Sequence, residues 1–197
     1  MSDLARFWPA WLGDELRRRL EAAYGDEARG YHDLRHLREV LHHVDDLLDA
    51  HDPAREVVLL AAWFHDAVYE GRDDDEEVSA RLAEETLPDP AVAAEVGRLV
   101  RLTRTHRPSP EDRSGQVLCD ADLAILAADP DRYATYVRGV RAEHAEVADA
   151  GFAAGRAAVL RDLLSKPSLY HCASARARWE LTARANIERE IRSLTSP

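Results

Sequence analysis

An imidazole and a carboxylate stand side by side in an apolar run of this 197-residue sequence, at His65 and Asp66. Burying both groups without partners is costly, and a bound metal cation removes that cost. Neighbouring residues of a helix point about 100° apart, so both reach one ion only if the seam between them faces it. Further ligands must then come from other helices. The sequence offers His36 upstream and Asp122 downstream.

The neighbours of these two candidates indicate which side chains point inward. His36 flanks an apolar helical stripe that includes Leu37 and Val40, which directs the imidazole toward the interior. Asp120 and Asp122 are about 200° apart on a helix, so they cannot aim at the same centre. Apolar residues at helical spacing predict Asp122 as the buried member. Asp120 is then expected to cap the start of a helix or to support a ligand.

Two imidazoles and two carboxylates form a mixed nitrogen and oxygen set that leaves positions open for water and substrate. This set predicts one divalent ion, with Mn, Co, Ni, Fe, Mg and Zn as candidates, rather than a closed structural zinc site. The chemistry that it supports is hydrolysis of a phosphate ester by metal-bound water. The ion lowers the pKa of the water, orients a phosphoryl oxygen and offsets the developing negative charge.

Helical periodicity dominates the chain and no strand alternation is evident, so the fold class is predicted as an all-α bundle. We expect one domain over 1–197 with its core at about 30–192. The helix at 53–69 is apolar nearly all round and should be central, and 105–115 is the clearest loop. Helices are expected at about 33–50, 53–69, 73–87, 90–105, 116–128, 130–149, 152–165 and 174–194.

The charge of the chain limits its partners. With 26 Lys and Arg against 37 Asp and Glu, the net charge is −11, which disfavours general binding to nucleic acid or anionic membranes. A small phosphorylated substrate remains compatible, held by local arginines such as Arg35, Arg101, Arg104 and Arg107. Two cysteines without redox or metal spacing, and no signal-like or membrane-spanning run, predict a cytoplasmic protein. A homo-oligomer is left open.

An ordered His, His-Asp, Asp set resembles the HD superfamily of metal-dependent phosphohydrolases, and in particular a bacterial branch of predicted phosphohydrolases. The similarity runs through the passages at 31–36 (Tyr-His-Asp-Leu-Arg-His), 64–69 (Phe-His-Asp-Ala-Val-Tyr), 74–80, 120–123 and 184–190. The resemblance implies an HD-domain helical bundle. It also implies metal ligation by His36, His65, Asp66 and Asp122, but it supplies no substrate.

One departure from the family concerns the carboxylate that moves a proton. Many nucleotidase members carry a glutamate three residues after the HD aspartate, where this chain has Tyr69. The role then falls to Glu70 or to the acidic run, and the resemblance favours Asp75 and Glu76. With the ligand Asp66 they are the predicted catalytic carboxylates.

His106 is the remaining catalytic candidate. It follows Thr103 at a three-residue interval, so the two can share a helix face and contact a phosphate, or His106 can protonate a leaving group. Two-metal HD enzymes generally need two extra histidines between the HD pair and the last aspartate. His106 is the only one in that interval, which favours a single-metal site.

The sequence therefore predicts a metal-dependent phosphohydrolase that acts on a small phosphorylated metabolite or nucleotide. Three alternatives stay open. The first is a non-catalytic HD-fold module that binds metal or nucleotide for regulation. The others are a di-iron oxygenase on the same framework and a helical bundle with a purely structural His-Asp network.

Overall fold

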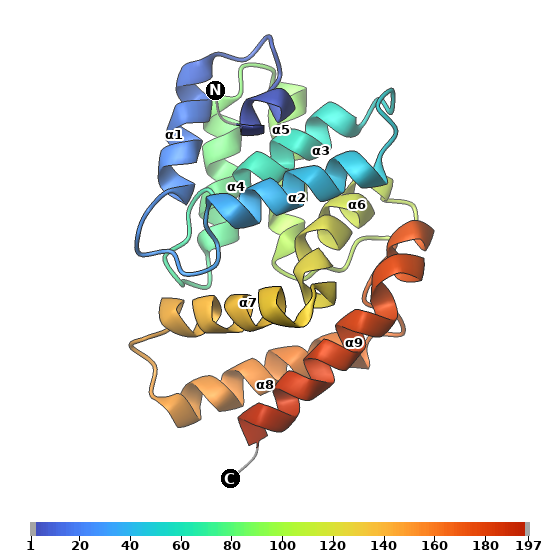
Figure 1. Ribbon diagram of the computed structural model, residues 1–197. Coiled ribbons are helices and arrows are strands. Elements are labelled where there is room, and N and C mark those ends of the chain that lie inside the picture. Colours follow the sequence, from blue (N-terminus) through green and yellow to red (C-terminus); the bar gives the residue numbers. More distant parts are fainter. Residues whose placement is uncertain (1–2, 196–197) are drawn as a thin grey trace.

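The computed structural model describes residues 3–195, and every regular element among them is a helix, as the sequence predicts (Figure 1). None of the helices in this range has the length and apolar character that crossing a bilayer requires. In chain order, with η for 3₁₀-helices, the elements are η1 (Asp3–Phe7), α1 (Asp14–Tyr24), α2 (Leu34–Leu47), α3 (Arg55–Phe64), α4 (Asp75–Thr86), α5 (Pro90–Thr103), α6 (Arg113–Asp122), η2 (Leu123–Ala127), α7 (Pro130–Glu143), α8 (Asp149–Ser165) and α9 (Ala173–Thr195).

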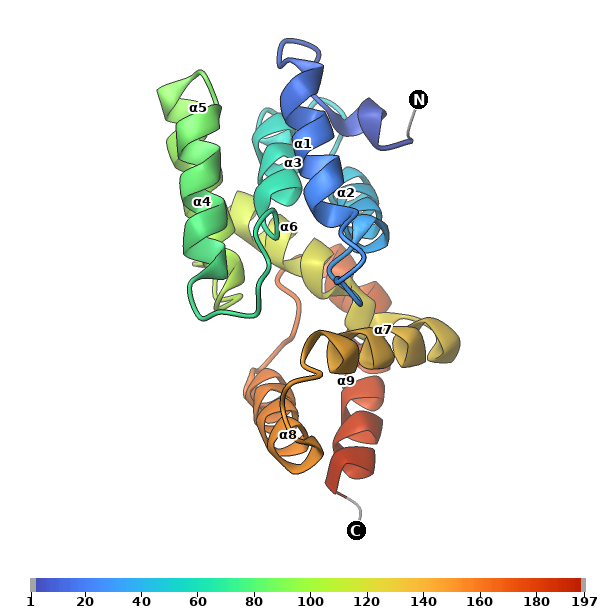
Figure 2. The same cartoon turned by 90° about the vertical axis from the view of Figure 1, so that its left-hand side faces the viewer.

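The helices form two packed groups. Elements η1 to α6 surround one apolar core, in which α2, α3 and α6 contact one another. Elements η2 to α9 enclose a second, smaller core, with α9 packed along η2 and α8. Figure 2 shows α8 and the C-terminal part of α9 extending away from the first group, with α7 between them and the remaining helices. The first group holds the predicted ligands, and the second group borders them from one side.

Helix α3 is central, as its composition predicts, because Val58 to Phe64 are all buried. It ends at Phe64 rather than near Tyr69, so His65 and Asp66 lie in the turn that follows and not inside a helix. Tertiary partners explain the early end. The backbone N–H of Asp66 donates to the Tyr24 hydroxyl, and that of Val68 donates to Ser79 Oγ. These two N–H groups therefore do not form the hydrogen bonds to carbonyl oxygens one turn earlier that would continue α3.

The core begins earlier in the chain than the predicted position near residue 30. Leu4, Phe7, Leu20 and Tyr24 are buried in the first core, so η1 and α1 belong to it. Helix α1 carries Leu16, Leu20 and Tyr24 at four-residue intervals, a helical apolar stripe that the predicted core boundary leaves out. Burial of this stripe against the helices of the first group stabilises the segment.

Several other helix ends differ from the predicted ones. Helix α6 begins three residues early, after Asp112, whose side chain accepts from Gly115 N, and it tightens into η2 beyond Asp122. Helix α7 ends at Glu143 instead of 149, and α8 begins at Asp149. The predicted starts at Pro90 and Pro130 hold, because an aspartate caps each helix and proline suits its first turn.

We expect Leu20→Ala to lower the free energy of unfolding by about 2–5 kcal/mol, because a fully buried leucine leaves a cavity when it is truncated. Leu20 is 2% exposed. Urea unfolding followed by circular dichroism measures the change, and Leu181→Ala is the control because Leu181 is 86% exposed. Equal midpoints for the two variants would show that α1 is not part of the core.

Candidate metal centre and adjoining pocket

Four side chains from three parts of the chain meet inside the first helical group. His36 lies on α2, His65 and Asp66 follow α3, and Asp122 ends α6. The Nε2 atoms of the two histidines are 3.0 Å apart. Asp66 Oδ2 lies 3.3 Å from Nε2 of His36 and 3.0 Å from Nε2 of His65. Asp122 Oδ1 lies 3.2 Å and 3.6 Å from the same two nitrogens. We call these four residues the His/Asp cluster.

The spacing of these atoms suits a bound divalent ion. Ligand atoms about 2.1 Å from an ion are about 3.0 Å apart at a right angle and about 3.4 Å apart at a tetrahedral angle. The separations in the cluster, 3.0 to 3.6 Å, span these values. His36, His65 and Asp66 form a group that can hold a metal, and Asp122 adds a carboxylate beside both nitrogens.

The orientation of His65 is fixed by its other ring nitrogen. Nδ1 lies 2.8 Å from the carbonyl oxygen of Ala62. Since a carbonyl only accepts, Nδ1 carries the proton and Nε2 presents a lone pair to the cluster in the neutral imidazole. The Tyr24 hydroxyl lies 3.4 Å from the same Nδ1 and 3.1 Å from Asp66 N. Tyr24 therefore supports both residues of the His-Asp pair.

Arg29 holds the turn that carries the pair. Its guanidinium donates to the carbonyl oxygens of His32 and Asp66 at 2.8 Å each, and to that of Ala67 at 3.2 Å. One cation thus joins the segment before α2 to the turn after α3. Because carbonyl oxygens near a helix end lack helical partners, the guanidinium also satisfies acceptors that would otherwise be unpaired.

The start of α2 fixes the position of His36. Asp33 Oδ1 accepts from the backbone N–H of Arg35 at 2.8 Å and from that of His36 at 3.0 Å. His36 is 1% exposed, and it shares the buried side of the helix with Leu37 and Val40. The capping aspartate therefore sets the register in which the imidazole faces the cluster.

The cluster residues control one another's charge. Burial disfavours the charged form of all four groups, but their mutual contacts outweigh it. Asp122 and Asp66 raise the pKa of His36, and the pKa of His65 is held well above its usual value. Contacts with histidines hold the pKa of each carboxyl well below its usual range. Since a metal ligand must be an unprotonated imidazole, metal binding here should compete with protons.

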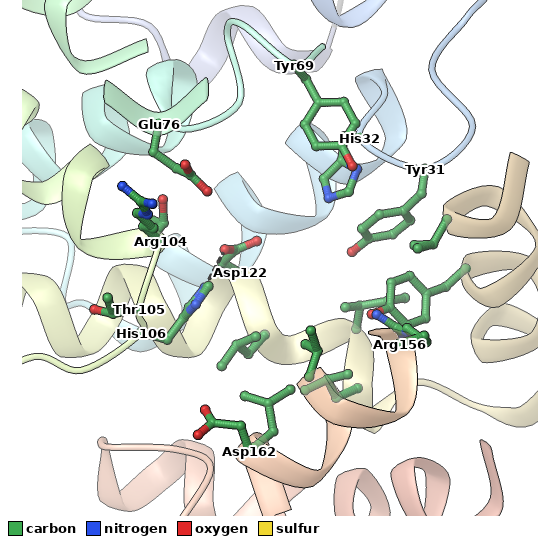
Figure 3. A pocket seen from close by; sticks show the side chains of 18 of the residues that line it. Tyr31, His32, Tyr69, Glu76, Arg104, Thr105, His106, Asp122, Arg156 and Asp162 are labelled. Atoms are coloured by element: carbon green, nitrogen blue, oxygen red, sulfur yellow. Dashed lines mark hydrogen bonds and ion pairs between the residues drawn. The ribbon is translucent and has the colours of Figure 1, made fainter. Parts of the chain in front are cut away.

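A pocket of about 630 Å³ adjoins the cluster, and Asp122 forms part of its wall (Figure 3). The two carboxylate side chains of the cluster are each 15% exposed, whereas those of the histidines are 1–2% exposed. The cluster is therefore most accessible at its carboxylates. Polar side chains around this pocket include Tyr31, His32, Tyr69, Glu76, Arg104 and His106.

His106 contacts the cluster directly. Its Nε2 lies 2.8 Å from Asp122 Oδ2, the interaction drawn in Figure 3. The second oxygen of Asp122 is thus held by His106 while the first faces the two histidines. His106 has a φ of 50°, the one positive value for a non-glycine residue among residues 3–195. Thr103 also lines the pocket, but its hydroxyl donates to the carbonyl oxygen of Val100 at 2.7 Å.

Of the candidate proton-moving carboxylates, Glu76 is the one that the structure brings to the pocket. Burial raises the pKa of Glu76; nearby Asp66 adds to this rise, and Arg104 opposes it. Asp75 lies outside the pocket lining, where its Oδ2 accepts from the backbone N–H of Glu70 at 2.8 Å and of Arg72 at 3.0 Å. The side chain of Glu70 is 60% exposed and pairs with Arg72. Neither joins the cluster.

The prediction that Asp122 is the more buried of the two aspartates on α6 is wrong. Asp120 is 0% exposed, whereas the side chain of Asp122 is 15% exposed. The carboxylate of Asp120 accepts at 2.7 Å from the backbone N–H groups of both His171 and Cys172. It is therefore not a helix-start cap but an anchor for the segment before α9, and this distant segment covers it. As predicted, it does not face the cluster.

The four arginines proposed for phosphate binding differ in their surroundings. Three of them form ion pairs: Arg35 with Glu39, Arg101 with Glu77 and Glu84, and Arg107 with Asp162. Arg104 lines the pocket, and its guanidinium forms no ion pair with the described residues. The structure therefore leaves Arg104 as the arginine available to an anionic ligand.

Sequence reasoning missed the partner of His32. Glu143 Oε2 lies 2.8 Å from His32 Nδ1, and its Oε1 accepts from the backbone N–H of Tyr31 and His32 at 2.7 and 2.9 Å. Despite burial, these contacts, with the His32 side chain first, lower the pKa of Glu143 to about 2. The His32 ring also stacks on Tyr69. No local pattern signals a contact across more than a hundred residues of chain.

Comparisons with protein-family models, curated proteins and solved structures give no significant match. The similarity to the HD superfamily therefore depends on the short passages described above. Function must be inferred from the side chains of the His/Asp cluster and its pocket.

We expect His65→Ala to abolish binding of a divalent ion with little loss of helix, because His65 follows α3 and supplies one ligand atom. Isothermal titration with Mn²⁺ and elemental analysis measure binding, and far-ultraviolet circular dichroism measures helix content. His51→Ala is the control, since the side chain of His51 is 97% exposed. Equal metal content in wild type and His65→Ala would exclude a metal at the cluster.

Proposed function

We propose that this protein is a metal-dependent phosphohydrolase acting on a small phosphorylated metabolite or nucleotide. The observation that carries the proposal is the convergence of His36, His65, Asp66 and Asp122 beside a pocket. A divalent ion bound there lowers the pKa of a water molecule and offsets negative charge on a phosphoryl oxygen. The position of Asp122 in the pocket wall, and the guanidinium of Arg104, which forms no ion pair with the described residues, support an anionic substrate that enters from the pocket.

Glu76 is the group to which we assign proton transfer. It lines the pocket, and its raised pKa keeps more of the acid form near neutral pH, which suits a residue that exchanges a proton during turnover. Asp75 does not take this role, because its carboxylate holds the backbone between Glu70 and the start of α4. Asp66 takes part as a ligand rather than as a proton carrier, since its pKa is held low.

His106 is assigned to positioning Asp122. The nitrogen that faces the cluster is already hydrogen-bonded to Asp122 Oδ2 at 2.8 Å. A partner of this kind orients a ligand carboxylate and tunes its affinity for the ion. Protonation of a leaving group by the same nitrogen would require that contact to break, which favours Glu76 for that step.

The test of this function is release of inorganic phosphate from glycerol 2-phosphate, whose alkoxide leaving group needs a proton, with and without added Mn²⁺. We expect turnover only with the ion, and a kcat lower by about 10²–10⁴-fold in Glu76→Gln at unchanged metal content, the scale of general acid–base catalysis. Glu85→Gln is the control, because Glu85 is exposed on the same helix. Turnover that persists after the metal is removed, or wild-type kcat in Glu76→Gln, would contradict the assigned mechanism.

The same measurements separate the alternatives. One ion per chain with turnover supports the hydrolase. One ion per chain with phosphate binding but no turnover across a panel of phosphate esters supports a regulatory module. Two irons per chain support an oxygenase, and a stable protein that binds no metal supports a structural His-Asp network.

We expect His106→Ala to weaken Mn²⁺ binding by about 10–100-fold, because loss of a residue that orients a ligand has effects of this size. Titration of Mn²⁺ against the purified variant measures the affinity. His144→Ala is the comparison, because His144 also lines the pocket but is not part of the cluster. Unchanged metal affinity in His106→Ala together with a raised KM would instead place His106 on the substrate.

A further inference from the structure

Tyr31 carries a hydroxyl group that forms no hydrogen bond with residues 3–195, although Tyr31 is only 4% exposed. Its ring packs against that of His36, with 4.7 Å between centroids. Figure 3 shows the hydroxyl directed into the pocket toward Asp122. Buried polar atoms are nearly always paired, so an unpaired one indicates a polar group that binds beside it. The phenol hydroxyl of a tyrosine can donate a hydrogen bond to such a group.

A second donor lies across from Tyr31. The guanidinium of Arg104 lines the pocket without an ion pair among the described residues. In Figure 3, Tyr31 and Arg104 flank Asp122 on opposite sides. The end of the pocket nearest the His/Asp cluster therefore presents two donors that form no hydrogen bond or ion pair among the described residues, and the cationic one, Arg104, acts electrostatically on Glu76. Two such donors suit an anionic oxygen group.

The rest of the pocket wall has a different character. It is formed largely by the second helical group and is apolar, with Leu123, Ile125 and Leu126 from η2, Val140 from α7, and Val159 and Leu163 from α8. A volume of about 630 Å³ leaves room here for an organic group in addition to a phosphate. We call these six residues the apolar wall.

Of the charged or titratable side chains near the apolar wall, three have polar partners in the protein, namely Arg156, Asp162 and Lys166, and the fourth, His144, lies against the ring of Phe152. Arg156 donates to the Tyr136 hydroxyl at 2.6 Å and to Glu190 at 2.8 Å. Asp162 pairs with Arg107. A site that selects a polar group such as a nucleobase aims free donors and acceptors at it. The wall therefore favours an apolar organic group.

From these observations we propose that the pocket binds a phosphate monoester whose organic group is aromatic or branched aliphatic. The phosphate lies between Tyr31 and Arg104, and the organic group lies against the apolar wall. This inference rests on the proposed function for the reaction, and on the pocket alone for the class of ligand.

The reaction implied for such a ligand is hydrolysis of its ester bond. A water oxygen forms a bond to phosphorus and the bond from phosphorus to the ester oxygen breaks. The leaving oxygen takes up one proton, so the products are an alcohol or phenol and inorganic phosphate. The apolar wall holds the part of the ligand that leaves, which accounts for its position beyond the phosphate end.

Binding of non-hydrolysable phosphonates tests the ligand class without requiring turnover. Titration calorimetry in Mn²⁺-containing buffer compares benzylphosphonate, methylphosphonate and the phosphonate analogue of adenosine 5′-monophosphate. We expect benzylphosphonate to bind about 10–100-fold more tightly than methylphosphonate, from the apolar area that a phenyl ring buries. It should also bind more tightly than the nucleotide analogue. Equal affinities for benzylphosphonate and methylphosphonate, or tighter binding of the nucleotide analogue, would overturn the proposal.

Variants at the two ends of the pocket test the orientation. Val159→Gln should weaken the binding of benzylphosphonate several-fold and leave the binding of methylphosphonate unchanged. Val159 is 56% exposed, so it can be changed without opening the core. Leu181→Gln on α9 is the exposed control. Tyr31→Phe should weaken both phosphonates by about 10-fold, the scale of a hydrogen bond to a charged group. Without ligand its melting temperature should be no lower than that of the wild type, because it loses an unpaired hydroxyl.

Wild-type affinities in Tyr31→Phe would overturn the placement of the phosphate. The outcome is distinct from failure of the proposed function. Selective binding of benzylphosphonate without hydrolysis of benzyl phosphate would refute the hydrolase and leave the ligand class intact. Hydrolysis of phosphate esters without any preference for apolar groups would refute the ligand class and leave the hydrolase intact.

Discussion

Mutual compensation of charge among two imidazoles and two carboxylates is the interaction on which the rest of this structure depends. Each group alone would be unstable as an ion in the interior, and together their contacts keep the imidazoles basic and the carboxyls acidic. Removing one partner from a buried ion pair typically costs about 3–5 kcal/mol, because the other charge is left uncompensated. The fold must therefore deliver four side chains from three parts of the chain, so that the two histidine Nε2 atoms lie within 3.6 Å of each other and of both carboxylates.

The ends of helices, rather than their middles, meet this requirement. Helix α3 ends directly before His65, and α6 ends at Asp122, so these side chains project from positions where the backbone changes direction. Unpaired backbone groups at such ends need partners. Arg29 and Tyr24 supply them, and the same contacts fix the orientation of the ligands. The same two side chains thus pair the backbone groups at the helix end and position the ligands of the cluster.

The second helical group turns a buried cluster into a site with a pocket. Glu143, at the end of α7, holds the segment before α2 through backbone and side-chain contacts. On the far wall, Arg156 of α8 binds Glu190 of α9 and Tyr136 of α7. This buried network ties the three helices together and uses the polar groups that would otherwise face a ligand. The pocket consequently has donors near the cluster and an apolar surface away from it.

The sequence by itself determined the all-α class, the central position of α3 and the candidate ligands. Repeating apolar residues at helical spacing, and polar residues that interrupt them, are local signals that do not depend on long-range contacts. The starts of α5 and α7 were likewise predictable, because an aspartate followed by proline defines a helix start locally.

Only the tertiary structure decided where α3 ends and which of Asp120 and Asp122 is more buried. In each case a partner distant in sequence decides: Tyr24 for the turn after α3, and the backbone at His171 and Cys172 for Asp120. The acidic run at the start of α4 is a further example, because the sequence pattern does not distinguish Asp75 from Glu76. Folding turns Asp75 toward backbone N–H groups and Glu76 toward the pocket, because adjacent residues of a helix point in different directions.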